Sequence, residues 1–274
     1  MNDRVSQSIK SQLDKLEKIS NQISLLISAG EYGKINHLDK MRKKIIAMIP
    51  ARKGSTRLKL KNLVMLNKKP LISYSIDAAK KSCVFHKIFV NSDSPIFKKV
   101  AKKHNVDFYL RPKNIGKSSV KSDNVVLDFI KKNDCDFIVW VNPISPLQSS
   151  KEIRKVVKYF IKKRLNSLIT VVDKKVHFVF NKKPVNFSLN KKFQQTQKLI
   201  PVSEFCYSIM MWSKKTFLRA MKKKGYAILH GKVGYYKVDP LSGVIVKTKE
   251  DIKLLEAIIS SRKNKKKIKY DKTL

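Results

Sequence analysis

One apolar run that opens directly into a basic loop constrains this chain more than any other segment. Residues 45–49 (IIAMI) show no polar alternation, which is typical of a parallel strand buried on both faces. The loop that follows contains Arg52, Gly54, Ser55 and several lysines. Because ligands of open α/β sheets bind at the carboxyl ends of the strands, we expect an anion site in this loop.

The residue types in this loop suit a polyphosphate. Gly54 lets the backbone approach a ligand closely, Ser55 supplies a hydroxyl donor, and Arg52 offers a planar fork for two phosphate oxygens. Lys59 and Lys61 add positive charge. A solvated basic loop stays open as the alternative. The pattern is neither a Walker A loop nor the Gly-x-Gly-x-x-Gly fingerprint of dinucleotide sites.

The net charge of the chain is strongly positive, with 61 lysine and arginine residues against 20 acidic ones and a formal charge of +41. Such an excess raises the question of nucleic-acid binding. The lysines, however, occur in nearly every segment instead of in one block. Because no zinc-finger spacing, RNP-type aromatic motif or helix-turn-helix accompanies the charge, we expect no specific nucleic-acid partner. The positive potential suits the capture of an anionic small substrate.

The cysteines and the apolar runs bear on where the protein works. Cys83, Cys135 and Cys206 lie far apart and form neither a metal-binding pattern nor a disulfide framework. Residues 1–9 are polar and lack the apolar core of a signal peptide, and no run of about 18 apolar residues occurs. We therefore expect a cytoplasmic protein with no membrane partner.

Strand-like and helix-like segments alternate from residue 43 onward. The pattern predicts strands at 45–49, 87–91, 136–141 and 167–172, with helices near 71–81, 96–104, 124–132 and 152–163. Such alternation is typical of βαβ units and a mainly parallel sheet. Later segments predict a helix at 213–221, short strands at 226–229 and 235–238, and a last helix at 249–260.

Two segments flank this α/β domain, which spans residues 43–262, and a third interrupts it. Residues 1–42 carry apolar residues at spacings of three and four, which predicts an N-terminal helical extension. Between 174 and 210 the periodicity fades into short runs that suit an inserted β-rich arm. Residues 263–274 form a basic tail, which we expect to be solvated.

Several short motifs follow one another along the domain. They are IPARKGS at 49–55 with Lys61 and Asn62, KPLI at 69–72, NSD at 91–93, LRP at 110–112, NPISPL at 142–147 and TKED at 248–251. In this order they resemble the cytidylyltransferases that activate acidic sugars, the CMP-sialic acid synthetase family with its relatives for pseudaminic, legionaminic and Kdo acids.

The resemblance implies a three-layer Rossmann-like nucleotidyltransferase fold, similar to glycosyltransferase-A folds, with a mainly parallel sheet and an arm at 174–210 that forms a homodimer. It implies that the anomeric hydroxyl of an acidic keto-sugar attacks the α-phosphate of CTP, giving a CMP-sugar and pyrophosphate. The site residues implied by matching the family motifs are the catalytic residues Arg52 and Lys61, the nucleotide-binding residues Arg52, Gly54, Ser55, Lys61, Asn62, Arg111 and Ser122, and the sugar-binding residue Asn142.

Structural roles stay open for several of these residues. Arg111 precedes Pro112 and would also suit an extended surface segment. Asp93 follows a strand and would also suit the N-cap of the next helix. The five histidines show no spacing that compels a metal site or a catalytic base.

The metal-binding aspartates of the family are missing from this chain. The family's late motif reads Asp-x-Asp-Thr-x-Glu-Asp, and its two metal ligands fall at Ile245 and Lys247, while a further aspartate of the Kdo enzymes falls at Ile144. Because Mg²⁺ prefers carboxylate and phosphate oxygens, we expect no metal held by these positions and Mg²⁺ delivered with CTP. Contributions from Asp93 or Asp239, or a fixed charge from Lys247, stay open. The loss also favours an alternative function, a degenerate cytidylyltransferase fold that binds nucleotide or a partner without turnover.

Overall fold

Strand β1 (Ile45–Ala51) lies inside a seven-stranded sheet and is buried over almost its whole length, as its unbroken apolar sequence predicts. The structure is a computed structural model that describes residues 43–55 and 57–263. The predicted helical extension at 1–42 and the predicted basic tail after residue 263 lie outside these residues.

The sheet is mainly parallel, which confirms the predicted fold class. Besides β1 it contains β4 (Lys87–Ser92), β5 (Asp107–Leu110), β6 (Phe137–Val141), β7 (Ser167–Lys174), β10 (Val202–Ser213) and β11 (Val233–Lys237). The strand order is β11-β7-β10-β6-β1-β4-β5. β1 pairs in parallel with β4 and β6, β4 with β5, and β7 with β11, whereas β10 runs antiparallel to β6 and β7.

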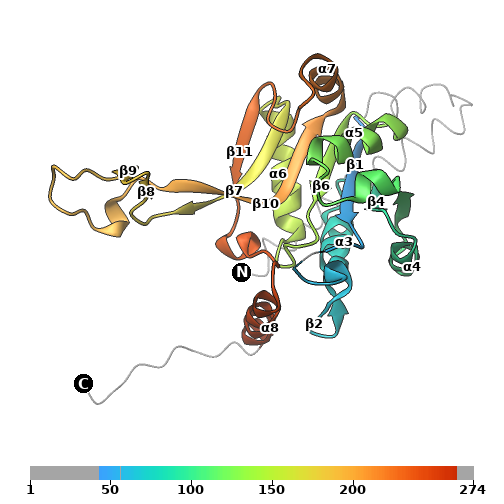
Figure 1. Ribbon diagram of the computed structural model, residues 1–274, viewed down its shortest axis with the longest axis horizontal. Coiled ribbons are helices and arrows are strands. Elements are labelled where there is room, and N and C mark those ends of the chain that lie inside the picture. Colours follow the sequence, from blue (N-terminus) through green and yellow to red (C-terminus); the bar gives the residue numbers. More distant parts are fainter. Residues whose placement is uncertain (1–42, 56, 264–274) are drawn as a thin grey trace, which may run out of the picture. The chain divides into compact units, whose positions relative to one another are not determined.

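Helices cover both faces of the sheet and complete the three predicted layers (Figure 1). The helices α3 (Leu71–Ser82), α4 (Ile96–Lys103) and α6 (Ser150–Lys162) pack on the face that carries Ile45, Ala47 and Ile49. The helices α5 (Ser122–Lys132) and α7 (Lys214–Lys224) pack on the face of Ile46 and Met48. This alternation of side chains along β1 places apolar groups on both faces of the sheet.

A third apolar cluster joins α8 (Lys249–Lys263) to Leu58, Leu66 and Leu71, so the late segment packs beside the loop that follows β1. Within the part of the chain that the structure describes, no helix combines the length and apolarity needed to cross a membrane. The short elements are β2 (Met65–Leu66), β3 (Lys69–Pro70), β8 (Val179–Phe180), β9 (Lys183–Pro184) and the 3₁₀ helices η1 (Lys61–Leu63), η2 (Lys113–Gly116), η3 (Thr196–Lys198) and η4 (Pro240–Gly243).

The predicted β-rich arm corresponds to a hairpin of β8 and β9 that projects from the end of the β7–β10 ribbon (Figure 1). Its bounds differ from the prediction at one end. β10 runs without a break from the arm into the central sheet, and Ile209 and Met210 are buried there. The last residues of the predicted range therefore belong to the core.

Two further predictions about single elements were wrong or incomplete. No strand forms at 226–229, because the N–H groups of Ala227 and Ile228 donate to the side chain of Asp123 and the carbonyl of Ile228 accepts from Trp212 Nε1. Side chains already provide hydrogen-bond partners for these backbone groups, so they do not pair with a neighbouring strand. The strand β5, which forms an edge of the sheet, was not among the predicted strands.

Candidate active site

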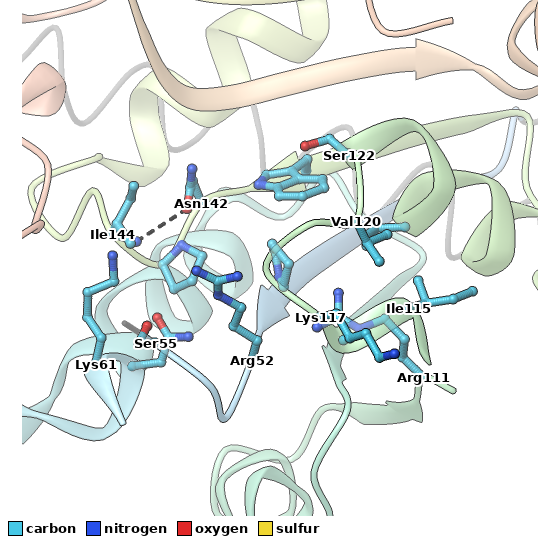
Figure 2. Close-up of a pocket in the computed structure, with 16 residues that line it drawn as sticks. Arg52, Ser55, Lys61, Arg111, Ile115, Lys117, Val120, Ser122, Asn142 and Ile144 are labelled. Atoms are coloured by element: carbon cyan, nitrogen blue, oxygen red, sulfur yellow. Dashed lines mark hydrogen bonds between the residues drawn. The ribbon is translucent and has the colours of Figure 1, made fainter. Parts of the chain in front are cut away.

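A pocket opens at the carboxyl end of β1, between the loop after β1, the segment from Arg111 to α5, and the loop after β6 (Figure 2). Its volume is about 230 Å³. Seven of the eight predicted site residues line it, namely Arg52, Ser55, Lys61, Asn62, Arg111, Ser122 and Asn142. Gly54 is not among the lining residues. Residues separated by up to 90 positions in the sequence therefore meet where the sheet topology predicts a ligand.

The loop after β1 is held in place by Asp93, at the end of β4. The backbone N–H of Lys53 donates to Asp93 Oδ1 at 3.0 Å. On its other side Asp93 contacts Gly116, where a Cβ atom would lie only 2.5 Å from the Cβ and Oδ2 atoms of Asp93. Pro95, not Asp93, is the N-cap residue of α4 and no side-chain cap bond forms. The role of Asp93 is thus to join two walls of the pocket, and Gly116 permits that close approach.

Lys61 is the most constrained of the pocket cations. Its Nζ donates to the carbonyl of Val246 at 3.0 Å, which fixes the ammonium beside the late loop. Burial lowers the pKa of Lys61, and the positive charges of Arg57, Arg52 and Lys247 lower it further. A polyanion in this pocket would relieve that repulsion, because each phosphate charge favours the protonated form of the lysine.

Arg111 lies at the inner end of the pocket and is only 5% exposed. Its backbone N–H donates to Ser92 at 2.7 Å, and its Nη2 contacts the carbonyl of Ala51 at 3.5 Å, while Nε has no hydrogen-bond partner. Burial lowers the pKa of Arg111, and the carboxylates of Asp93 and Asp128 oppose that shift. Burial rules out the open surface role for this residue, because a solvated arginine would not leave a donor without a partner.

The polar residues of the pocket differ in whether their hydrogen-bonding groups already have partners in the protein. Asn62 is buried and its Oδ1 has no partner, which leaves an acceptor unsatisfied. Ser122 is the first residue of α5, where a helix exposes free N–H groups. Asn142 is held from both ends, since its Nδ2 donates to the carbonyl of Tyr207 at 3.1 Å and its Oδ1 accepts from Ile144 N–H at 3.4 Å (Figure 2). Its amide is therefore oriented by the protein.

Among the lining residues that sequence reasoning missed, two carry polar side-chain groups, Lys117 and Trp140. Lys117 follows η2 and adds a cation to the wall that the segment from Arg111 to α5 forms (Figure 2). Trp140 lies in β6, two residues before Asn142, and its buried Nε1 has no hydrogen-bond partner. An aromatic residue inside an apolar strand resembles an ordinary core residue, so the local sequence did not indicate that Trp140 lines a pocket.

The donor set of the pocket does not fit a metal ion held by the protein. No carboxylate lines it, and among residues 43–55 and 57–263 no group of three histidine, cysteine or acidic side chains is arranged to hold a metal. The segment at Ile245–Lys247 does lie beside the pocket, because Val246 N–H donates to the carbonyl of Ile144 at 2.9 Å and the Val246 carbonyl accepts from Lys61. It brings an apolar side chain and a lysine where magnesium would need oxygen ligands.

The two aspartates considered as substitutes are occupied elsewhere. Asp93 Oδ1 accepts from the backbone of Lys53, and Asp239 Oδ1 accepts from the N–H of Leu241 at 2.8 Å to cap η4. Asp251, in the same late motif, accepts from the N–H groups of Lys247 and Thr248. Asp93 and Asp251 therefore hold loops beside the pocket, whereas Asp239 caps η4.

Comparisons with known proteins bear on the family and the fold of this chain. A family model described as Cytidylyltransferase matches residues 46–223. The N-acylneuraminate cytidylyltransferase of Escherichia coli O18:K1:H7 (strain RS218 / NMEC) is 38% identical over 125 residues, which cover 44% of this chain and 29% of that protein. The post-translational flagellin modification protein B of Campylobacter coli is 26% identical over 229 residues, covering 80% of this chain and 96% of that protein.

The match with the N-acylneuraminate cytidylyltransferases spans about a third of their length, 33% in Streptococcus agalactiae serotype V. Among solved structures, the CMP:2-keto-3-deoxy-manno-octonic acid synthetase complexed with CTP superposes with a TM-score of 0.61 at 14% sequence identity, over 80% of this chain and 99% of that one. At this identity the likeness concerns the fold, and it agrees with the parallel sheet and the flanking helices described above.

Proposed function

Because the chain belongs to the cytidylyltransferase family, we propose that it transfers CMP from CTP to an acidic keto-sugar of the sialic, pseudaminic or legionaminic type and releases pyrophosphate. The observation that carries this proposal is the convergence of Arg52, Lys61 and Arg111 with Ser55 and Asn62 in one pocket at the end of β1. Cations and short polar side chains in that arrangement suit a nucleoside triphosphate.

The proposed roles are those that the family motifs imply, and the positions of the groups support them. Arg52, Ser55 and Lys61 bind the triphosphate, and the backbone at Gly54 approaches it. Asn62, Arg111 and Ser122 face the nucleoside. Asn62 and Arg111 are buried, and Ser122 lies across the pocket from Ser55 (Figure 2). The oriented amide of Asn142 faces the acceptor sugar.

For this reaction the protein has to position the two substrates and stabilise negative charge, and no covalent intermediate with the protein is required. The anomeric oxygen of the sugar forms a bond to the α-phosphorus of CTP, and the bond from that phosphorus to the β-phosphate oxygen breaks. The hydroxyl proton leaves to solvent and the electron pair leaves with pyrophosphate. Arg52 and Lys61 are the catalytic residues of this proposal, because fixed positive charge stabilises the charge that builds on the phosphate oxygens.

Cytidylyltransferases of this kind generally use a divalent metal ion. The carboxylate-free wall of this pocket does not supply ligands for it. We therefore propose that Mg²⁺ enters bound to the phosphates of CTP and depends on them for most of its ligands.

The arm suits the association of two copies of the chain. Large apolar side chains along it are exposed, among them Phe180 (71%), Phe193 (81%) and Ile200 (77%). Monomeric soluble proteins rarely expose so many apolar groups together. Replacing Phe180 and Phe193 by serine is expected to convert a species of twice the chain mass into a single chain, measured by light scattering after size exclusion.

The test of the function is pyrophosphate release from CTP with N-acetylneuraminic, pseudaminic, legionaminic and Kdo acids in turn, with Mg²⁺ or Mn²⁺ present. We expect release with one sugar, and loss of at least about a hundredfold in Arg52→Ala, because a charge-assisted contact to the phosphates disappears. Arg219→Ala, which removes an exposed arginine of α7 far along the chain from the pocket residues, serves as the matched control.

Binding measurements separate this proposal from the degenerate alternative. CTP should raise the melting temperature of the wild type by mass action and should do so less in Arg52→Ala. Protein that binds CTP but releases no pyrophosphate with any of the four sugars would favour the non-catalytic function. Absence of a shift at millimolar CTP would argue against both.

A further inference from the structure

Glu152, in the first turn of α6, uses its side chain for more than helix capping. Its backbone N–H donates to Ser149 Oγ at 3.1 Å, which is one half of a capping box. In a complete capping box the glutamate side chain returns to the backbone N–H of the N-cap residue. Here the carboxylate instead binds Asp239 and Ser242, which lie 87 and 90 positions later in the chain. The side chain therefore joins two distant segments.

Both carboxylate oxygens of Glu152 accept hydrogen bonds. Oε1 accepts from the backbone N–H of Asp239 at 2.7 Å. Oε2 accepts from Ser242 Oγ at 2.6 Å and from Gln148 Nε2 at 2.9 Å. Ser242 is 2% exposed and Gln148 is 4% exposed, so these bonds lie away from water, where hydrogen bonds to a charged group are strongest. Glu152 thus fixes η4 and the residue before it against the start of α6.

The 3₁₀ helix η4 leads directly into the late loop beside the pocket. Gly243, the last residue of η4, packs so closely on β7 that a Cβ atom there would lie 2.6 Å from Val172 Cγ2. Three residues further on, the N–H of Val246 donates to the carbonyl of Ile144 at 2.9 Å. Because so short a segment joins these two fixed points, we expect a displacement of η4 to move Val246 as well.

Val246 is the residue that holds Lys61. Its carbonyl accepts from Lys61 Nζ at 3.0 Å, and the Lys61 side chain extends toward Ile144, another residue that lines the pocket (Figure 2). Burial lowers the pKa of Lys61, and the charges of Arg57 and Arg52 lower it further. Because these effects disfavour the ammonium, the acceptor at Val246 both stabilises the charge and fixes its direction.

We propose that Glu152 is a positioning residue for the triphosphate. Its carboxylate fixes η4, and η4 sets the place of the Val246 carbonyl that orients the Lys61 ammonium. Glu152 is not among the residues that line the pocket, so it acts through the backbone of the late loop and not by touching the nucleotide. This inference rests on the proposed function and adds to it a residue that the sequence motifs do not include.

The test is a double-mutant cycle in which CTP is titrated, with Mg²⁺ present, into wild type, Glu152→Ala, Lys61→Ala and the double variant in a calorimeter. We expect Glu152→Ala to raise the Kd for CTP about tenfold, because the Lys61 ammonium is no longer fixed toward the phosphates. The melting temperature should fall as well, because the buried Ser242 and Gln148 lose a hydrogen-bond partner. In the Lys61→Ala background the same substitution should change the Kd less than about twofold, since the group that Glu152 positions is gone.

A milder variant and a control accompany the cycle. Ser242→Ala removes one of the bonds to Glu152 and should raise the Kd about threefold, again only when Lys61 is present. The cycle is repeated with Ser242→Ala if Glu152→Ala does not fold. Glu256→Ala removes a carboxylate of α8 that likewise accepts from a distant backbone N–H, that of Asn67 at 3.2 Å. Because that bond lies at the β2–β3 hairpin, Glu256→Ala should lower the melting temperature and leave the Kd within about twofold of wild type.

The outcomes separate the inference from the proposed function. An unchanged Kd in a folded Glu152→Ala would overturn the inference. An equal rise with and without Lys61 would also overturn it, because the carboxylate would then act on the fold as a whole. If wild type binds no CTP, the proposed function fails and the inference with it. If wild type binds CTP and the Glu152 and Ser242 variants bind it equally well, only the inference is refuted.

Discussion

The contact between Gly116 and Asp93 gives the sharpest test of how the pocket is built. In Gly116→Ala the new Cβ would lie 2.5 Å from the Cβ and Oδ2 atoms of Asp93 and 2.8 Å from its Cγ. Carbon atoms in ordinary contact lie about 3.5 Å apart, so Asp93 or the η2 segment has to move by about 1 Å. Because Asp93 Oδ1 accepts from Lys53 N–H at 3.0 Å, a shift of Asp93 by that amount breaks the bond.

Two estimates of the cost agree. Forcing one extra carbon into a packed site costs about 1 to 3 kcal/mol, and losing a hydrogen bond to a charged group costs about 1.5 to 3 kcal/mol. The structure relaxes by one route or the other, so we expect Gly116→Ala to lower the free energy of unfolding by about 2 kcal/mol. For a domain of this size that corresponds to a fall in melting temperature of about 4 to 8 °C, measured by calorimetry. CTP should also bind more weakly, because Lys53 lies between Arg52 and Ser55 in the loop that the bond to Asp93 fixes.

Gly54→Ala is the matched control, since a Cβ at residue 54 meets nothing within 4 Å. Its stability should stay within about 0.5 kcal/mol of wild type, while its response to CTP falls if a phosphate approaches that backbone. In an Asp93→Gly background, where the clashing atoms are gone, adding Gly116→Ala should cost almost nothing. A Gly116→Ala protein that melts within about 1 °C of wild type and binds CTP equally well would refute the reasoning.

Two further predictions concern charge. Lys247, in the loop beside the pocket, should matter for the phosphates, so Lys247→Ala is expected to weaken CTP binding about tenfold and Lys249→Ala less than about twofold; equal losses in a CTP titration would count against that role. Burial raises the pKa of Asp77, but the hydrogen bond and charge of Lys69, with His104, outweigh it and hold that pKa below its ordinary value. A depressed pKa contributes stability above the unfolded-state pKa and loses it as pH falls. Asp77→Asn should therefore cost about 0.5 to 1 kcal/mol at pH 7 in urea unfolding, and progressively less as the pH falls below about 3.9. A pH-independent difference would contradict this.

The sequence predicts those parts of the molecule whose determinants are local. The apolar run at β1, the periodic helices and the motif order are sufficient for a parallel sheet, and the rule for carboxyl strand ends then brings Arg52 and Arg111 together. Predictions failed where a distant side chain decides the backbone. Asp123 satisfies the N–H groups of Ala227 and Ile228, which the local pattern assigned to a strand. The spacing of apolar and polar residues within a segment does not indicate hydrogen-bond partners that lie far away in the sequence.

Tyr207 in β10, which has a left-handed backbone conformation with φ of +55°, belongs to the same class. Its sequence neighbours are typical of a strand, and only the buried hydroxyl of Thr170, 37 positions earlier, reveals the bulge at which the pairing of β7 with β10 shifts register. A strained residue of this kind costs of the order of 1 to 3 kcal/mol. Local rules fail here because a distant side chain fixes the backbone.

Lys61 and Arg111, in the pocket, differ from the exposed lysines because contacts with the protein hold their side chains in place. Many lysines among the described residues are exposed, and exposed charges more than about 8 Å apart are screened at physiological salt. Lys61 is tied to the Val246 carbonyl, and Arg111 is buried behind the loop after β1. With no carboxylate among them, these cations repel one another, as the lowered pKa of Lys61 reflects through burial and its arginine neighbours. A triphosphate that enters the pocket relieves this repulsion, so the site is selective for concentrated negative charge even in a chain with a formal charge of +41.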